Sequence, residues 1–176
     1  FCGLHRRSDL RQGLEDLQQE WKFCLRMREI DLARNPADDI SDDDFWQTIL
    51  KDIDTGQFYL IIATPPCNTH SRARSNWREF AGPKPLRSQN HPLGFPWLEG
   101  QQLAQCELSN FLVARSFEAI DHGFHAGARH LIEHPEDLGV TPQGDVPAAI
   151  WQLPMARQTQ ALTDAVTWAL FQCRHA

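Results

Sequence analysis

One apolar run limits how this chain can fold more than any other feature of its sequence. Residues 58–63 read Phe-Tyr-Leu-Ile-Ile-Ala, without alternation of apolar and polar side chains, and Pro65-Pro66 follow almost at once. A continuous run of this kind is typical of a central parallel strand that is covered on both faces. The diproline then ends the strand, because proline donates no ladder hydrogen bond. The sequence therefore predicts a parallel sheet with this strand inside it.

The segments on either side of this run alternate between helical and extended patterns. Apolar spacing predicts helices over residues 9–20 behind the N-cap Ser8, from Ser41 to Gly56, and over 101–120, with a short helix from Pro147 to Leu153 that Pro154 ends. Strands are predicted at residues 1–3, 23–27, 58–63, 129–132 and 166–171. This order indicates an α/β fold, with a Rossmann-like, mostly parallel sheet and helices on both faces.

Length and composition favour one domain over residues 1–176. The chain has 176 residues, of which 41% are hydrophobic, and it begins at Phe1, so we expect a domain cut at both ends from a longer protein. It contains no run of eighteen apolar residues, which predicts no membrane-spanning helix. The five cysteines are scattered, without a Cys-x-x-Cys pair, so we expect reduced thiols and an intracellular location, nuclear if the source is eukaryotic.

The net charge of -6 hides a division along the chain. Acidic residues dominate from Glu29 to Asp54, whereas basic residues dominate from Cys67 to His91. The basic stretch lies in a long predicted loop, residues 67–100, and loops of that length are usually functional or disordered. We expect it to meet an anion through its cationic side chains, which are Arg72, Arg74, Arg78, Lys84 and Arg87.

Cys67 is the most informative residue of this loop. The diproline before it stiffens the backbone and thereby aims the thiol. Positive neighbours favour the thiolate, which is the reactive form. A cysteine after a strand can also be a small buried hydrophobe, but the diproline and the basic flank favour a reactive role. Ligands of parallel sheets gather where strands end, and Glu133 is predicted to follow another strand at the same edge.

The segment from Pro65 to Ser71 resembles the catalytic loop of the DNA (cytosine-5)-methyltransferase family, which reads Pro-Cys after a central strand with a Ser four residues beyond the Cys. The segment 131–135, Leu-Ile-Glu-His-Pro, is similar to the family's Glu-Asn-Val or Glu-Asn-Pro turn, with His134 in place of Asn. The resemblance implies that Cys67 attacks C6 of cytosine in DNA and that Glu133 polarises the base. It further implies a substrate-binding set, which is Pro66, Ser71, Arg72 and Arg74.

The resemblance also implies S-adenosylmethionine as the cofactor, although these motifs match less fully. Phe1 and Gly3 fit the family's Phe-x-Gly-x-Gly motif, in which His5 replaces the second glycine. Glu29 stands where an acid would bind the ribose hydroxyls, and Asp39 where one would face the adenine amino group. Carboxylates suit those donors, but solvated acids at helix starts and in loops are an equally good interpretation.

Three further matches complete the predicted site. Asp31 is a second choice for the ribose, Pro65 is assigned to the cofactor, and Arg174 to catalysis because Gln172-Cys173-Arg174 has the Gln-x-Arg spacing of a later family motif. Residues 82–96, with Gly-Pro-Lys-Pro-Leu-Arg-Ser and His-Pro-Leu-Gly-Phe-Pro, resemble the divergent methylase-like reading frames of mobile elements in microbial eukaryotes.

Other functions fit these residues less well. Methylation of an amino group would need Asp or Asn before the diproline and an aromatic residue after it, where this chain has Thr64 and Cys67. A thiol hydrolase built on Cys67 and His70 would place both members of its dyad on one rigid loop, which is unusual. Four histidines, His122, His125, His130 and His134, lack a cysteine pair to complete a common zinc set, so no metal is expected.

The main alternative is a degenerate domain that binds nucleic acid without catalysis. Residues 72–97 combine basic side chains with Trp77, Phe95 and Trp97, a mixture that can follow phosphates and stack on bases. The retained Cys67 and Glu133 favour the enzyme. His134 in place of Asn and the incomplete glycine motif, in which His5 replaces the second glycine, favour the alternative. The residues do not distinguish DNA from RNA as the nucleic acid, and they specify neither a target sequence nor an oligomeric state.

Overall fold

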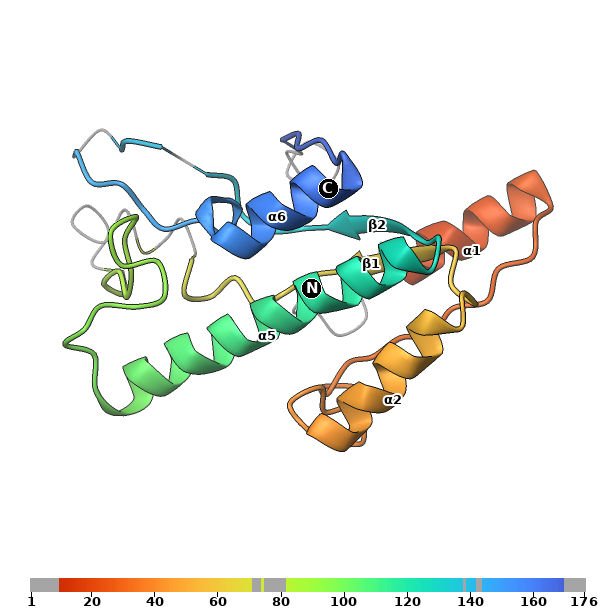
Figure 1. The fold of residues 1–176 in the computed structure, drawn as a ribbon, viewed down its shortest axis with the longest axis horizontal. Coiled ribbons are helices and arrows are strands. Elements are labelled where there is room, and N and C mark those ends of the chain that lie inside the picture. The colour runs from red at the N-terminus through yellow and green to blue at the C-terminus, as the bar shows by residue number, and fades with distance from the viewer. Residues whose placement is uncertain (1–9, 71–73, 75–81, 138, 142–143, 170–176) are drawn as a thin grey trace. The chain divides into compact units, whose positions relative to one another are not determined.

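The structure is a computed structural model of the chain, and it describes residues 10–70, 74, 82–137, 139–141 and 144–169 (Figure 1). The chain divides into two compact units, unit 1 (residues 1–40) and unit 2 (residues 41–176). The single domain predicted over residues 1–176 stays a prediction.

Unit 1 contains one described helix, α1 (Leu10–Trp21), which confirms the helix predicted over residues 9–20. The strand predicted at residues 23–27 is wrong, because this segment forms no ladder and continues as irregular backbone and turns to residue 40. Alternating apolar residues indicate a half-buried extended chain, and a strand needs in addition a partner for its backbone groups. The strand predicted at residues 1–3 lies outside the described residues.

Unit 2 begins with α2 (Asp43–Asp54), close to the predicted helix. The N-cap is Asp42 and not Ser41, because the Asp42 carboxylate accepts a hydrogen bond from the backbone N–H of Phe45 at 2.7 Å. Asp43 and Asp44 in the first turn also suit the positive end of the helix. The buried residues of α2 form the face that packs on α5, and they are Trp46, Ile49, Leu50 and Ile53.

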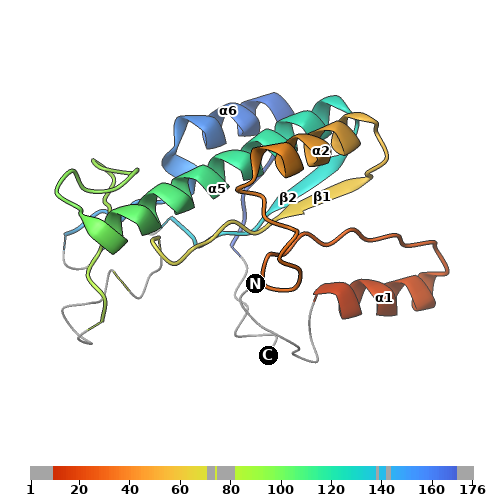
Figure 2. The ribbon, with the colours of Figure 1, turned by 90° about the horizontal axis from the view of Figure 1, so that it is seen from below.

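The described sheet consists of β1 (Leu60–Ala63) and β2 (Arg129–Ile132), which pair in parallel with Leu60 opposite Arg129 and Ala63 opposite Ile132. The parallel pair and its two strand positions agree with the sequence. The burial does not, since Leu60 is 42% exposed and the rest of β1 is half-buried. Within unit 2, the described helices α2, α5 and α6 lie on one side of the two strands (Figure 2).

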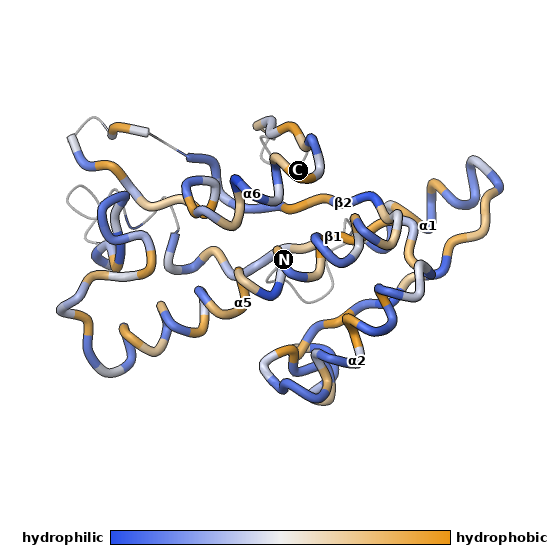
Figure 3. Tube along the Cα trace, in the orientation of Figure 1, coloured by the Kyte–Doolittle hydropathy of each residue, from blue (hydrophilic) through white to orange (hydrophobic). Residues whose placement is uncertain are grey.

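The long helix α5 (Gly100–His125) connects the two strands and packs against both of them. Its hydrophobic and hydrophilic residues are interleaved along its length (Figure 3), as suits a helix with neighbours on several sides. Gly123 lies where α5 crosses β1, and a Cβ atom there would stand 2.2 Å from Cδ1 of Ile61. The absence of a side chain at this position therefore permits the close approach of helix and strand.

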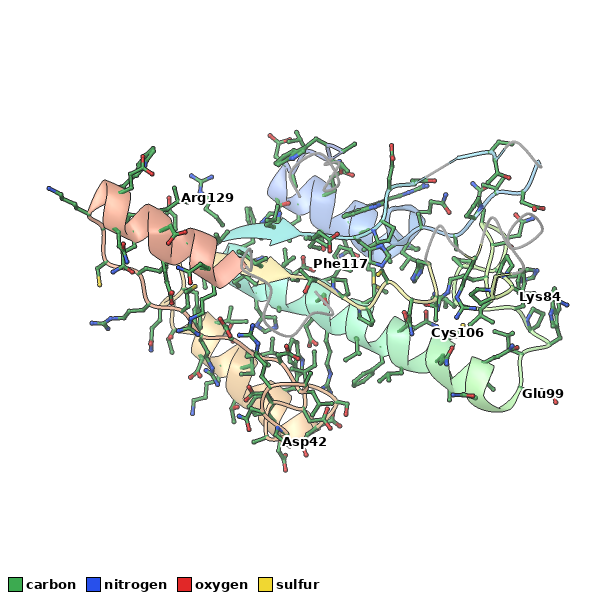
Figure 4. The ribbon with its side chains drawn as sticks, turned by 180° about the vertical axis from the view of Figure 1, so that it is seen from behind. Asp42, Lys84, Glu99, Cys106, Phe117 and Arg129 are labelled. Atoms are coloured by element: carbon green, nitrogen blue, oxygen red, sulfur yellow. The ribbon has the colours of Figure 1, made fainter. Side chains whose placement is uncertain are left out.

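After β2 the chain forms a short 3-10 helix (Ile150–Gln152) and then α6 (Pro154–Thr163). The short helix predicted from Pro147 to Leu153 is formed only as this 3-10 helix, and it ends before Pro154 as predicted. Pro154 is in addition the first residue of α6. Proline suits that position, since its missing N–H would be unpaired there in any case. A core cluster of unit 2 joins α5 to this region through Val113, Phe117, Ile150, Leu153 and Ala156, with Ile132 packed against it. Figure 4 labels Phe117 of this cluster.

The last predicted strand, residues 166–171, is not formed over 166–169, which are irregular, and residues 170 and 171 lie outside the described part. Two parallel strands joined through a helix agree with the α/β pattern. The larger Rossmann-like sheet with helices on both faces stays a prediction. Among the described helices, none has the length and apolar character needed to cross a membrane.

Candidate functional site

The two strands end at the same edge of the sheet, and each leads into a segment that the sequence analysis singled out. The β1 exit (residues 64–70) carries Cys67, and the β2 exit (residues 133–137) begins with Glu133. Ala63 lies opposite Ile132 in the ladder, and the N–H of Glu133 donates to the carbonyl of Ala63 at 3.0 Å. The parallel register thus brings the predicted nucleophile and the predicted carboxylate to neighbouring strand ends.

Both of these side chains reach solvent. Cys67 is exposed and begins a tight turn, in which the N–H of His70 donates to the Cys67 carbonyl at 2.9 Å. Glu133 is exposed as well. Pro65 is buried and Pro66 half-buried, so the diproline anchors the segment that presents the thiol. An accessible thiol on a fixed turn has the exposure that a reagent or substrate would need.

A buried polar cluster lies beneath the β1 exit. The Thr69 hydroxyl donates to the Ser109 hydroxyl of α5 at 3.0 Å, and Ser109 donates to the Pro66 carbonyl at 3.5 Å. Thr69 also lies 3.4 Å from Nδ1 of His70. Thr69 and Ser109 are almost completely buried, and hydrogen bonding compensates for the loss of their hydration.

Arg87 belongs to the same cluster, although the sequence analysis placed it on a solvated basic loop. It is only 3% exposed, and its Nη1 donates to the Pro92 carbonyl and to Oδ1 of Asn110, both at 2.9 Å. The same Nη1 lies 3.0 Å from Nε2 of His70, so its two N–H groups are shared among three neighbours. Burial lowers its pKa. The expectation that Arg87 meets an external anion is therefore wrong, because its guanidinium ties the 82–98 loop to α5.

Arg74 is also engaged by the protein backbone. Its Nε donates to the Asn68 carbonyl at 2.7 Å, and its Nη1 donates to the Lys84 carbonyl at 2.9 Å. These two bonds join the β1 exit to the following loop. A contact of Arg74 with substrate stays a prediction, as do those of Ser71 and Arg72, which lie outside the described residues.

His134 follows Glu133 and lies on the buried side of the β2 exit, 8% exposed. Its ring meets His70 edge-on, with ring centres 4.9 Å apart, and approaches Trp151 at 6.3 Å. The carbonyls of Pro66 and Pro135 lie nearby, but neither ring nitrogen has a hydrogen bond of ordinary geometry within the described residues. Burial lowers the pKa of His134 to about 4.

His70 has the same electrostatic character. Burial, helped by the neighbouring charge of Arg87, lowers the pKa of His70 to about 3. Both imidazoles are therefore neutral at neutral pH. No pattern in the sequence indicates this pair, because the contact of the two rings depends on how the two strand exits approach each other.

A cavity of about 830 Å³ opens beside the β2 exit. Its lining includes Glu133, His134 and Trp151, with Phe117 below and α6 at the side, and His70 also contributes. Its lining does not include Cys67. The Trp151 indole donates to the Pro135 carbonyl at 2.9 Å and so fixes one wall. The cavity combines an apolar wall with carboxylate and imidazole groups, as ligand sites commonly do.

The predicted cofactor acids Glu29, Asp31 and Asp39 lie in unit 1. Both carboxylate oxygens of Glu29 are engaged by guanidinium groups, Oε1 by Arg11 at 3.1 Å and Oε2 by Arg34. Asp31 caps a turn by accepting from the N–H of Ala33 at 2.9 Å, and Asp39 is half-buried. Phe1 and Gly3 lie outside the described residues, as does Arg174 of unit 2. Their roles in cofactor binding or catalysis stay predictions.

The predicted histidine group is not assembled into a metal site in the part of the chain that the structure describes. His122 pairs with Asp54 through Nδ1 at 2.7 Å, and His125 contacts the Asp121 carbonyl at 2.7 Å. His130 lies 3.3 Å from the Thr163 hydroxyl, and His134 occupies the β2 exit. The four side chains therefore have separate structural surroundings.

Comparisons of the chain with models of protein families, with curated proteins and with solved structures give no match. The resemblance to cytosine-5 methyltransferases therefore depends on the residues quoted from the sequence.

Proposed function

We propose that this chain is a methyltransferase domain that transfers a methyl group from S-adenosylmethionine to C5 of cytosine in DNA. One observation supports the proposal above the others. Cys67 and Glu133 follow paired parallel strands at the same sheet edge, and both side chains are exposed. The proposal includes an intracellular location, nuclear if the source is eukaryotic.

The chemistry needs two groups of these kinds. Carbon 5 of cytosine is a poor nucleophile, and addition of the Cys67 thiolate to C6 makes a bond that sends an electron pair toward C5, so that one difficult step becomes two easier ones. Glu133 has the role of hydrogen bonding to the ring and amino nitrogens while that charge moves. The C5 electron pair would take up the methyl group, which leaves S-adenosylhomocysteine. The product forms when a base takes the C5 proton and the released electron pair expels the Cys67 thiolate from C6.

The cavity beside the β2 exit supports the same function. A base must leave the helical stack to reach a strand-end site, and a pocket of about 830 Å³ that is lined by Glu133, though not by Cys67, has enough room for a pyrimidine. The Trp151 ring and the neutral His134 ring line that space. We assign Pro66, Ser71, Arg72 and Arg74 to the DNA substrate, and Arg174 to the catalytic group.

The cofactor supplies the methyl group. The carboxylates of Glu29 and Asp39 are of the acceptor type that ribose hydroxyls and the adenine amine require. Both oxygens of Glu29 are engaged by guanidinium groups, so a ribose hydroxyl would use the remaining acceptor capacity of this carboxylate. Phe1, Gly3 and Pro65 complete the proposed cofactor set.

The test is covalent trapping on DNA that contains 5-fluorocytosine, with S-adenosylmethionine present. Fluorine cannot leave C5 as a proton does, so the sulfur stays bonded to C6 and the complex survives denaturation. We expect the parent protein to form this complex and Cys67→Ser to form none. Cys24→Ser is the matched control, because Cys24 is also exposed. Trapping that survives Cys67→Ser would remove Cys67 from its role.

A non-catalytic nucleic-acid-binding domain is the second candidate, and an aromatic cluster favours it. Trp97 is 66% exposed and stacks on Phe95 with ring centres 4.6 Å apart, while His91 meets both rings edge-on. An aromatic ring with an open face can stack on a base. Under this alternative, Trp97→Ala weakens salt-sensitive DNA binding, and S-adenosylhomocysteine gives no thermal stabilisation. Stabilisation by that compound supports the enzyme.

A further inference from the structure

The buried cluster beneath the β1 exit forms a directional chain of hydrogen bonds. Arg87 can only donate, so Nε2 of His70, 3.0 Å from Nη1, is on the accepting side of this contact and shares the two N–H groups of Nη1 with Pro92 and Asn110. A neutral imidazole that accepts at Nε2 carries its proton on Nδ1. That proton is directed to the Thr69 hydroxyl at 3.4 Å. Arg87 therefore determines which nitrogen of His70 donates.

The same order of donor and acceptor continues through the hydroxyl groups of Thr69 and Ser109. Because the Thr69 oxygen accepts from His70, its own proton is free to reach the Ser109 hydroxyl at 3.0 Å, and Ser109 donates in turn to the Pro66 carbonyl at 3.5 Å. The chain thus runs from the guanidinium on the 82–98 loop, across helix α5, to the peptide bond before Cys67.

Water has little access to replace these bonds. The exposed fractions are 2% for Thr69, 1% for Ser109 and 3% for Arg87. In such surroundings hydrogen bonds are stronger than in water and neighbouring bonds polarise each other. Two of the links are long, 3.4 Å between Thr69 and His70 and 3.5 Å between Ser109 and Pro66, and removing one hydroxyl leaves its partners unsatisfied.

The chain ends at a functionally important peptide bond. The Pro66 carbonyl belongs to the amide of Cys67, and the Cys67 carbonyl accepts from the N–H of His70 at 2.9 Å. Cys67 is therefore held on both sides through its backbone while its thiol stays exposed. Helix α5 provides one anchor and the turn itself the other.

We propose that Arg87, His70, Thr69 and Ser109 form a relay of positioning residues that fixes the backbone of Cys67 and so aims its thiol at substrate. The catalytic consequence rests on the proposed function, whereas the relay itself is a property of the fold. None of the four is assigned to touch the reacting base.

Two variants interrupt the relay with little change in shape. Ser109→Ala removes the donor to Pro66, and Thr69→Val replaces the hydroxyl by a methyl group of similar size. Thr69→Ser keeps the hydroxyl and is the rescuing variant. Ser116→Ala is the matched control, because Ser116 lies on the same helix and donates only to the Leu112 carbonyl of its own helix.

The first readout is the backbone amide resonance of Cys67 by NMR, which reports a hydrogen bond to the carbonyl of the preceding residue. We expect it to move in Ser109→Ala and Thr69→Val, and to stay at the parent position in Thr69→Ser and Ser116→Ala. A resonance that stays in place in Ser109→Ala would overturn the relay, whether or not the protein is an enzyme.

The second readout is the rate of covalent trapping on 5-fluorocytosine DNA. Small misplacements of a reacting group cost up to about a hundredfold in rate, and we expect Ser109→Ala to lower the trapping rate at saturating DNA about tenfold with the half-saturating DNA concentration unchanged. An unchanged rate together with a moved resonance overturns the positioning role. A parent protein that never traps contradicts the proposed function instead, and the amide resonance still decides the relay.

Discussion

The two strand exits lie at one sheet edge, yet different interactions hold them. At the β1 exit, a cation, an imidazole and two hydroxyls are joined by directional hydrogen bonds to the chain before Cys67. At the β2 exit, His134 is buried among aromatic rings with both ring nitrogens unpartnered in the described structure. Directional bonds specify where a group lies, whereas burial without bonds leaves polar atoms ready for another partner.

The largest expected effect comes from breaking the β1 exit at Arg87. Arg87→Ala leaves the acceptors on Pro92 and Asn110 buried without their donor, and we expect it to lower the free energy of unfolding by about 3 kcal/mol or more. Denaturant unfolding followed by fluorescence measures the loss. Arg157→Ala, at an exposed position of α6, should change stability by no more than about 0.5 kcal/mol. Equal effects of the two substitutions would show that the buried cation does not hold this exit.

Lowering the pH is expected to destabilise the protein through His134 at the β2 exit. His134 has a folded-state pKa of about 4 against an ordinary value of 6.5, so the unfolded chain binds the proton more readily. Stability is therefore full above pH 6.5 and falls as the pH drops toward 4. The loss for this residue is on the order of 2 kcal/mol at pH 5.

Urea unfolding at pH 7 and pH 5 measures this loss. His70 adds to it over a window from 6.5 down to about 3. We expect His134→Phe to reduce the difference in stability between the two pH values, and His125→Gln, at an exposed position, to leave it unchanged. A parent protein that is equally stable at both pH values would contradict a buried neutral imidazole.

The smallest effect concerns the wall of the cavity. Trp151→Phe keeps an aromatic ring and loses the indole bond to the Pro135 carbonyl, so we expect a loss of about 1 kcal/mol in the free energy of unfolding. Trp97→Phe, at the exposed ring of the aromatic cluster, should have almost no effect on stability. Thermal unfolding of the two variants in parallel measures the difference in their stability. Equal stability of the two variants would show that the bond from the Trp151 indole to the Pro135 carbonyl does not stabilise the β2 exit.

Hydrophobic periodicity was sufficient for the elements with a long, regular pattern. The helices α1, α2 and α5 and both strands of the parallel pair lie close to the predicted ranges. The extended segment at 23–27 could not be settled in this way, since an alternating pattern does not reveal whether a partner strand exists. Pro154 is compatible with both the end of one helix and the beginning of the next, and only the packing of α6 shows that it also begins one.

The candidate site could likewise be predicted only in part from the sequence. The order strand, Cys67, helix, strand, Glu133 predicts that both residues reach one edge, because parallel strands end together. Arg87 could not be assigned from sequence, since a cation within a basic, proline-rich run has the pattern of a surface residue. Its burial depends on the 82–98 loop folding back on α5, and a small cluster of Leu86, Leu98 and Cys106 makes that contact.

The register of β1 with β2 also determines which of two neighbouring side chains meets solvent. Glu133 is exposed and His134 is buried because successive residues at a strand end point to opposite sides. Inserting one residue into the Gly127 turn that precedes β2 would exchange the two, forcing a carboxylate inward and turning an imidazole outward. The length of that turn therefore governs the chemistry available at an edge several residues away.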